Sequence, residues 1–185
     1  MAYDETRGQV VLYGLDRRNL DWQTWTWDGS DWTPHVGPTA SPDPGRGVGG
    51  TFWFDRTVGE VVLFGGFNHG SFDQTAAWGW NGARWTNLPA LRAPSIQGAT
   101  VAVEPVRGRS VIYAKVGYSH SSTWVWNGGG WSDATTQPQP EVVLSSRLYP
   151  DPPGNRLILF GEVATGTTSW YEVWVWNGSS WRKSG

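Results

Sequence analysis

Short apolar runs bounded by glycine-containing turns recur along the whole chain. The clearest set covers residues 49–88, where GGTFWFD, EVVLFGG, AAWGWN and ARWTNL place β-branched and aromatic residues between turn residues. Runs of this kind are typical of short β-strands. No window of helical length shows a sustained helical period of apolar residues. The pattern therefore predicts an all-β chain with almost no helix.

The motif Trp-x-Trp-(Asn/Asp)-Gly-x-x-Trp occurs four times, with its central tryptophans 53, 46 and 50 residues apart. An Asn-Gly or Asp-Gly pair between β-forming residues predicts a hairpin with a type I′ turn, in which both central residues have positive φ. Each motif therefore predicts two antiparallel strands. The four copies together contain twelve of the fifteen tryptophans: Trp25, Trp27, Trp32, Trp78, Trp80, Trp85, Trp124, Trp126, Trp131, Trp174, Trp176 and Trp181.

A second block precedes each tryptophan motif and predicts another hairpin. An apolar segment is followed by a turn and then by a run of Val, Ile, Leu and aromatic residues. The blocks cover 2–14, 53–66, 102–114 and 148–161, and their turns are predicted to end at Gly8, Gly59, Gly108 and Gly154. Each repeat thus contains four strands, called a, b, c and d in chain order.

A unit of about 50 residues with four antiparallel strands matches the blade of a β-propeller. The run VVLFGG at 61–66, followed by a variable loop, an aromatic strand, a turn and a tryptophan, resembles the Kelch repeat of galactose-oxidase-like propellers. The double glycine after strand b is complete only at Gly65-Gly66, and an arginine before strand a is clear only at Arg46. We expect a single Kelch-like β-propeller array over 1–185, with blades at about 1–46, 47–95, 96–141 and 142–185.

The repeated tryptophans are predicted to pack between blades. Side-chain alternation puts the first two tryptophans of each motif on one face of strand c, and the third lies across the turn from them. The alternative is a ring of stacking platforms for sugars. Trp22, Trp53 and Trp170 lie outside the motif and are the better candidates for exposed contacts.

Composition and charge exclude several classes of function. The formal net charge is −2, so the basic footprint of a general nucleic-acid-binding protein is missing. No apolar run is long enough to cross a bilayer, and MAYDETRGQV at the start does not have the form of a signal peptide. Because the chain has no cysteine, it has no disulfide and no thiol nucleophile. None of this identifies the compartment.

The sequence offers no catalytic residue, metal site or cofactor. The resemblance to galactose oxidase implies a copper centre beside a Cys–Tyr crosslink, which a chain without cysteine cannot form. No G-x-S-x-G or H-E-x-x-H motif occurs. The many glycines are explained by turns. We therefore expect the protein not to be an enzyme.

Two related loops provide the candidate ligand site. GFNHGS at 66–71 and GYSHSS at 117–122 fall between strands b and c of the second and third repeats. The resemblance implies that b–c and d–a loops gather on one face and that ligands bind there. Inherited repeat sequence, with each histidine capping its loop, is the alternative explanation. The candidate residues are Phe67, Asn68, His69, Tyr118, Ser119 and His120. His35, in a Pro-rich loop, has no assigned role.

Together these features predict a non-catalytic binding or interaction module that recognises a protein or a glycan through its loop face. A structural assembly unit, an excised part of a larger propeller, or a hydrolase or lyase on a propeller scaffold are the alternatives. A clustered set of ionisable groups would favour the enzyme.

Four blades are few for a propeller of this kind, which raises the question of closure. Residues 1–4 supply only part of a strand a, and the chain has no additional strand with which to close a ring. We expect two copies to complete one eight-bladed ring. A closed four-bladed monomer is the competing arrangement.

Overall fold

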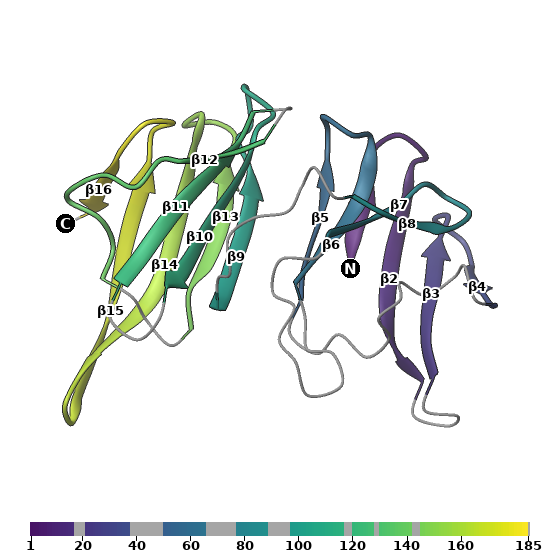
Figure 1. Cartoon of the computed structure of the whole chain (residues 1–185), viewed down its shortest axis with the longest axis horizontal. Coiled ribbons are helices and arrows are strands. Elements are labelled where there is room, and N and C mark those ends of the chain that lie inside the picture. The colour runs from purple at the N-terminus through teal and green to yellow at the C-terminus, as the bar shows by residue number, and fades with distance from the viewer. Residues whose placement is uncertain are drawn as a thin grey trace. The chain divides into compact units, whose positions relative to one another are not determined.

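The computed structural model describes residues 1–16, 21–37, 50–65, 77–88, 97–116, 120–127, 130–141 and 145–184 (Figure 1). These ranges contain sixteen strands in four four-stranded antiparallel sheets, and no helix. The prediction of an all-β, propeller-like fold is confirmed. No helix long and apolar enough to cross a membrane occurs in the described ranges.

Each sheet is formed by four consecutive strands, as in a propeller blade. Blade 1 contains β1 (Ala2–Asp4), β2 (Gln9–Asp16), β3 (Asp21–Trp27) and β4 (Trp32–His35). Blade 2 contains β5 (Thr51–Asp55), β6 (Glu60–Phe64), β7 (Ala77–Trp80) and β8 (Trp85–Asn87). Blade 3 contains β9 (Gln97–Val103), β10 (Ser110–Val116), β11 (His120–Trp126) and β12 (Trp131–Asp133). Blade 4 contains β13 (Arg147–Asp151), β14 (Arg156–Thr165), β15 (Thr168–Trp176) and β16 (Trp181–Ser184).

The chain divides into two compact units, each containing two blades. Met1–Pro94 holds blades 1 and 2, and Ser95–Gly185 holds blades 3 and 4. In each unit the buried apolar side chains of the two sheets face one another. The buried core of the first unit consists of Val11, Phe54, Val61, Leu63, Trp80 and Trp85. That of the second consists of Ala102, Val111, Tyr113, Val125, Leu148, Leu157, Leu159, Trp174, Trp176 and Trp181.

The a–b turns are four residues long and need one residue with positive φ. Gly8, Gly59 and Gly108 have φ of +68°, +69° and +66°. In blade 4 the same place is taken by Asn155, with φ of +47°, because Asp151 pairs with Arg156. The predicted turn end at Gly154 is therefore wrong by one residue. Asparagine tolerates the left-handed conformation better than most residues, so it can replace glycine here.

The c–d turns differ from the predicted type I′ geometry. The second and third tryptophans of each motif pair directly across the hairpin, as in Trp80 and Trp85, and four residues connect them. Asn81 Oδ1 accepts hydrogen bonds from the amides of Ala83 and Arg84, both at 3.0 Å. Only the glycine has positive φ, +95° at Gly82. The hairpin was predicted correctly, but its turn type was wrong because the asparagine side chain caps the loop as an Asx turn.

The last tryptophan of each even-numbered blade packs against the preceding blade. Trp85 Nε1 donates a 2.8 Å hydrogen bond to Thr24 Oγ1, and Trp85 lies edge-on to Tyr13 with ring centroids 5.7 Å apart. Trp181 makes the same contacts in the second unit. Its Nε1 donates to Thr123 Oγ1 at 2.8 Å, and its ring lies 5.8 Å from that of Tyr113. The two units thus contain the same junction.

Blades 1 and 3 share residue types that blades 2 and 4 lack. They have tyrosine in strand b where the even blades have phenylalanine, and threonine in strand c where the even blades have alanine or valine. They also have arginine at the third position of the a–b turn. In strand b these are Tyr13 and Tyr113 against Phe64 and Phe160, and in strand c they are Thr24 and Thr123 against Ala77 and Val173. In the a–b turn they are Arg7 and Arg107 against Val58 and Gly154. The repeat is therefore a pair of blades, a period that these positions display in the sequence but that single-blade alignment misses.

Candidate functional site

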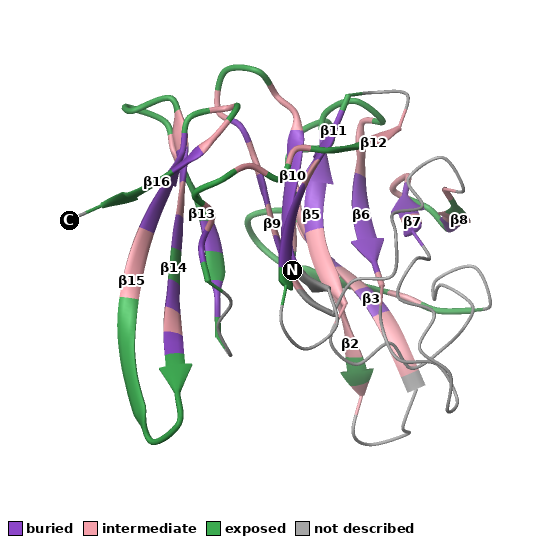
Figure 2. Cartoon of the chain, turned by 60° about the vertical axis from the view of Figure 1, so that its left-hand side comes forward, coloured by how far each residue is buried: buried purple, intermediate pink, exposed green. Residues whose placement is uncertain are grey.

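The hairpin of β14 and β15 in blade 4 contains the candidate site. These strands have ten and nine residues and are the longest that the structure describes. Figure 2 shows the part of β15 nearest the turn as exposed, whereas β14 still contains buried residues there, such as Val163 at 3% exposed. Trp170 is 41% exposed and Tyr171 is 64% exposed. The hairpin therefore presents two aromatic side chains to solvent near the b–c turn.

Glu172 is the centre of a polar cluster on the face of β15 that also bears Trp170 and Trp174. Trp170 Nε1 donates to Glu172 Oε1 at 2.9 Å, and Trp174 Nε1 donates to Oε2 at 2.8 Å. Lys183 from β16 donates to Oε1 at 2.5 Å. An ionised carboxylate has roughly four lone-pair sites, and these three donors leave acceptor capacity for a ligand.

The surroundings keep the Glu172 carboxylate ionised. Its side chain is 9% exposed, and this burial acts against the charge. Hydrogen bonds from Lys183, Trp170 and Trp174 outweigh the burial and lower the pKa of Glu172. The cluster thus presents a fixed, charged acceptor between two indole groups, with the ammonium of Lys183 beside it.

Blade 3 packs against the sheet face of blade 4 that bears the Glu172 cluster. The hydroxyl groups of Tyr113 and Ser121 both donate to the carbonyl oxygen of Pro140 at 2.9 Å, which ties the d–a segment of blade 3 to its strands. Burial raises the pKa of Tyr113 to about 12; Ser121 opposes this shift and the charge of Glu172 adds to it. Tyr113 therefore stays neutral and forms a firm wall of the junction.

The residue two positions before the first motif tryptophan differs in every blade, and Glu172 is the acidic example. Ser122 holds this position in blade 3, where it accepts a 2.9 Å hydrogen bond from Trp124 Nε1. Gln23 holds it in blade 1. Glu172 was not predicted as a site residue, because it lies two positions before the motif and the candidate site was placed on the two histidine loops. An acidic side chain that alternates with tryptophans in WYEVW was the available signal.

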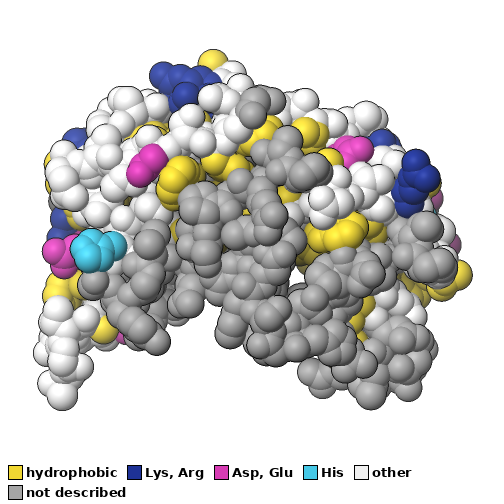
Figure 3. All heavy atoms as spheres, viewed as in Figure 1, with side chains coloured by type: hydrophobic (Ala, Val, Ile, Leu, Met, Phe, Trp, Pro, Cys, Tyr) yellow, Lys and Arg dark blue, Asp and Glu magenta, His cyan; other side chains and the backbone are white. Residues whose placement is uncertain are grey.

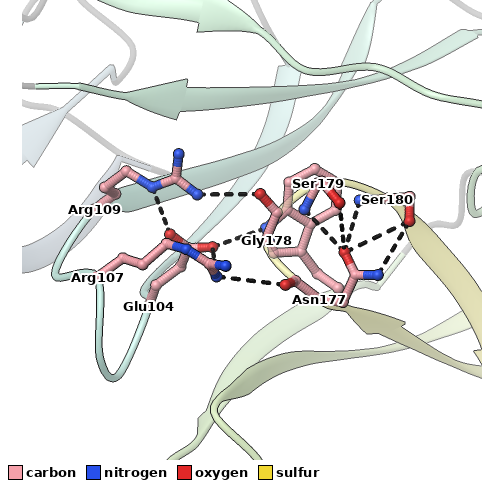
Figure 4. A network of polar contacts seen from close by, with 8 residues as sticks. Glu104, Arg107, Arg109, Asn177, Gly178, Ser179 and Ser180 are labelled. Carbon is pink, nitrogen blue, oxygen red and sulfur yellow. Dashed lines mark hydrogen bonds and ion pairs between the residues drawn. The ribbon is translucent and has the colours of Figure 1, made fainter.

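A second polar network joins the turns at the opposite end of the same two blades (Figure 4). Glu104, 3% exposed, accepts from Arg109 Nε at 2.6 Å and from Trp176 Nε1 at 3.2 Å. Arg109 also donates to the carbonyl oxygen of Gly178 at 3.1 Å. Every one of these groups already has a protein partner. We therefore interpret the network as an interblade lock, that is, a set of polar contacts that fixes blade 4 to blade 3.

That lock has a counterpart in the first unit. Arg7 pairs with Asp4 at 2.8 Å, as Arg107 approaches Glu104 at 3.6 Å. A Cβ atom added at Gly82 would collide with Arg7, and one added at Gly178 would collide with Arg107. Glycine in the c–d turn thus lets an arginine of the preceding blade lie across it.

The histidine-loop candidates are mostly outside the described residues. This applies to Phe67, Asn68, His69, Tyr118 and Ser119. His120 is described: it is exposed and begins β11, opposite Val116 of β10. By strand alternation it shares a face with Ser122 and Trp124, which is the face opposite to Ser121 and Tyr113. His120 therefore does not lie on the side of blade 3 that faces the Glu172 cluster.

The three tryptophans outside the motif have different environments. Trp170 is exposed, as expected. Trp22 is half-buried and stacks on Tyr13 with ring centroids 5.1 Å apart. The expectation of exposure is wrong for Trp53, which is 5% exposed and donates to Asp55 Oδ2 at 3.3 Å. Its ring also lies edge-on to that of Phe64, with centroids 6.4 Å apart.

His35 was expected to be an isolated loop residue, and this is wrong. It is the last residue of β4. Its Nε2 lies 3.0 Å from Thr26 Oγ1, and its ring lies edge-on to Trp80 with centroids 4.9 Å apart. His35 is therefore part of the junction between blades 1 and 2.

The motif tryptophans range from fully buried to exposed. Trp80, Trp126 and Trp176 are at most 1% exposed, whereas Trp32 is 42% exposed. The ring pairs across the c–d turns have similar geometry in all blades, with centroids 5.6 Å apart for Trp27 and Trp32 and 5.3 Å apart for Trp176 and Trp181. The motif thus builds the same paired rings four times, with exposed fractions that differ between blades.

On the face of the molecule drawn in Figure 3, the described Lys, Arg, Asp and Glu side chains occur in small scattered groups. The described residues contain no group of three or more His, Cys, Asp or Glu side chains placed to hold a metal ion. Binding of a neutral ligand requires neither a strongly charged surface nor a metal ion.

Two similar solved structures are lectins. The SapL1 lectin, in a structure with alpha methyl fucoside, has a TM-score of 0.53 and 20% identity over 95% of this chain and 59% of that chain. A fucose lectin from Kordia zhangzhouensis, in complex with methyl-fucoside, has a TM-score of 0.40 and 20% identity over 68% of this chain and 90% of that chain. Neither a protein-family model nor a curated protein sequence matches the chain. The chain spans 59% of the SapL1 lectin and is similar to it in fold.

Proposed function

We propose that this chain is a non-catalytic carbohydrate-binding module and that it binds sugar at the Glu172 cluster. The proposal rests on an ionised, hydrogen-bonded carboxylate that lies beside a half-exposed indole ring on one strand face. The fold similarity to a lectin solved with methyl fucoside supports carbohydrate as the ligand class and agrees with the expected absence of catalysis.

The chemistry of the cluster fits a neutral sugar. Sugar hydroxyl groups are donors, and Glu172 has acceptor capacity beyond its three protein donors. Lys183, 53% exposed, is a donor for ring or hydroxyl oxygens. The exposed ring of Trp170 offers an apolar surface to the C–H face of the sugar. Because two indole N–H groups already orient the carboxylate, little ordering is required when the ligand binds.

The histidine loops are part of the same proposal as a separate contact region. His120 is exposed at the start of β11, and GFNHGS provides the related segment in the preceding repeat. Since His120 lies on the other face of its blade, we assign it to a second site on the loop face. A protein partner at that face, and membership of the Kelch family, remain predictions.

Calorimetry with methyl fucoside, followed by a panel of neutral monosaccharides, tests the proposal. We expect Glu172→Gln and Trp170→Ala each to weaken binding by about 10- to 100-fold, the effect of losing a hydrogen bond to a charged group or a stacked ring. Tyr149→Ala is the matched control, because Tyr149 is 53% exposed but lies on the other face of blade 4.

Two results would contradict the proposal. The wild-type protein would bind no sugar of the panel, or the two cluster variants would bind as tightly as the Tyr149→Ala control. Thermal unfolding of each variant, measured alongside, separates a lost contact from a lost fold.

A further inference from the structure

The outward face of blade 4, the side of its sheet that does not face blade 3, exposes large apolar side chains. Tyr149 is paired with Ile158, and Phe160 with Val173, so these residues share that face. Tyr149 is 53% exposed and Phe160 is 42% exposed. Phe160 also stacks on Tyr171, with ring centroids 5.2 Å apart and planes 5° apart. This face thus exposes three aromatic rings, of which Phe160 and Tyr171 form a stacked pair.

The outward face of blade 1, the side that does not face blade 2, is aromatic too. Trp27 pairs with Val10 and with Trp32, and Tyr3 pairs with Val10, which puts all four on one face. Tyr3 is 56% exposed and Trp32 is 42% exposed. Exposed apolar surface of this kind is typical of interaction sites.

Equivalent positions in blades 2 and 3 are buried. Trp53 and Phe64 of blade 2 correspond to Tyr149 and Phe160, and they are 5% and 2% exposed. Trp126 of blade 3 corresponds to Trp27 and is 1% exposed, while Trp27 is only half-buried. The outward faces of blades 4 and 1 therefore expose the kinds of residue that are buried at the equivalent positions of blades 2 and 3.

The charges at the turns suggest how these faces meet. In the second unit, Arg109 pairs with Glu104 at 2.6 Å and also reaches the c–d turn of the next blade, at the Gly178 carbonyl oxygen. Arg156 holds the same position in blade 4 and pairs with Asp151 at 2.6 Å. The c–d turn of blade 1 contains two aspartates, DGSD at 28–31. Arg156 is thus placed on blade 4 as Arg109 is on blade 3, where it can reach the c–d turn of a following blade, and the acidic c–d turn of blade 1 is suited to that contact.

We propose that two copies of this chain associate head to tail, the outward face of blade 4 in each copy packing on the outward face of blade 1 in the other. Such a dimer has two identical junctions and leaves neither aromatic face in water. If each face buries on the order of 500 Å², the two junctions together bury about 2,000 Å², which is enough for a stable complex. Sugar binding is not needed for this association.

Sedimentation velocity at micromolar concentration tests the proposal. The wild-type protein is expected to sediment with the mass of two chains. Phe160→Asp, on blade 4, and Trp32→Asp, on blade 1, are each expected to give the mass of one chain, because either change puts a charge into both junctions. Tyr149→Glu repeats the blade 4 test at a second residue. Val106→Asp is the control: Val106 is 73% exposed but lies in the a–b turn of blade 3, and this variant stays dimeric.

Mixing the two variants tests the head-to-tail geometry. Phe160→Asp chains keep an intact blade 1 face, and Trp32→Asp chains keep an intact blade 4 face, so an equimolar mixture can form one sound junction. We expect dimers to reappear in the mixture at a concentration where each variant alone is monomeric. A wild-type monomer, a mixture that stays monomeric, or a Trp32→Asp variant that remains dimeric would overturn the proposal.

Discussion

The indole nitrogen of Trp181 donates a 2.8 Å hydrogen bond to the hydroxyl oxygen of Thr123, and both residues are buried. The bond crosses from β16 of blade 4 to β11 of blade 3. The same bond, at the same length, joins Trp85 to Thr24 in the first unit. A polar contact in an otherwise apolar junction has strict geometry, so it aligns the two sheets as well as holding them together.

Replacing Thr123 with valine should destabilise the protein by about 1–3 kcal/mol, because the buried Trp181 N–H loses its acceptor. Valine has nearly the same shape, and it is the residue at the corresponding position of blade 4. Urea unfolding measures the effect. Thr167→Val, in the exposed turn between β14 and β15, is the control and should change stability by less than about 0.5 kcal/mol. Equal effects in the two variants would mean that the hydrogen bond contributes little.

Replacing Trp126 with alanine should destabilise by about 3–5 kcal/mol, the range for truncating a fully buried large aromatic side chain. Trp126 is 1% exposed and Trp32, its matched control, is 42% exposed, so Trp32→Ala should cost much less. Chemical denaturation measures both losses. Both variants are made in the Phe160→Asp background, which we expect to be monomeric, so that dimer formation does not contribute to the measured stability. Similar losses in both variants would show that burial of the repeated tryptophans is not what stabilises the blades.

The stability of the first unit should decrease as the pH falls below about 6.5, the pKa of a histidine in an unfolded chain. Burial beside Thr26 and Trp80 lowers the pKa of His35 in the folded protein. The unfolded state therefore takes up a proton more readily, and acid favours unfolding. This contribution is complete above pH 6.5 and is lost as the pH falls toward the folded-state pKa. Thermal unfolding from pH 8 to pH 5 measures it; His35→Gln should remove this part of the decrease, and an unchanged profile would contradict it.

The double variant His69→Ala, His120→Ala should keep the thermal stability of the wild type and lose one class of binding site. His120 is exposed, so its removal costs little folding energy. Calorimetric stoichiometry distinguishes this result from an effect on the Glu172 cluster, where the affinity should be unchanged. If the double variant unfolds earlier and binds the full amount of sugar, the histidines have a structural role instead.

The strands and their order were predictable because hairpins depend on local sequence. Apolar runs separated by Gly8, Gly59 or Asn81-Gly82 specify two strands and the turn between them within a few residues. The errors concern turns in which an asparagine, and not the expected pattern of glycine conformations, determines the backbone geometry. Asn155 adopts the positive φ that was assigned to Gly154, and Asn81 caps its turn so that only Gly82 needs positive φ.

The candidate site was less predictable, because a strand pattern does not say which faces meet. The regular spacing of Trp170, Glu172 and Trp174 was visible in the sequence, but their hydrogen bonds to one another depend on rotamers that packing selects. The histidine pair was noticed as a repeated motif. His120, the member that the structure describes, lies on the opposite face of its blade from Ser121.

The sequence by itself determined four similar four-stranded sheets, since hairpin formation requires only neighbouring residues and an alternating pattern. Only the tertiary structure decided that the contacts of Trp181 with Thr123, Trp176 with Glu104 and His35 with Trp80 form the junctions. These partners lie far apart in the chain. Whether a buried N–H finds an acceptor depends on how two sheets pack face to face, and that packing optimises burial over both sheets at once.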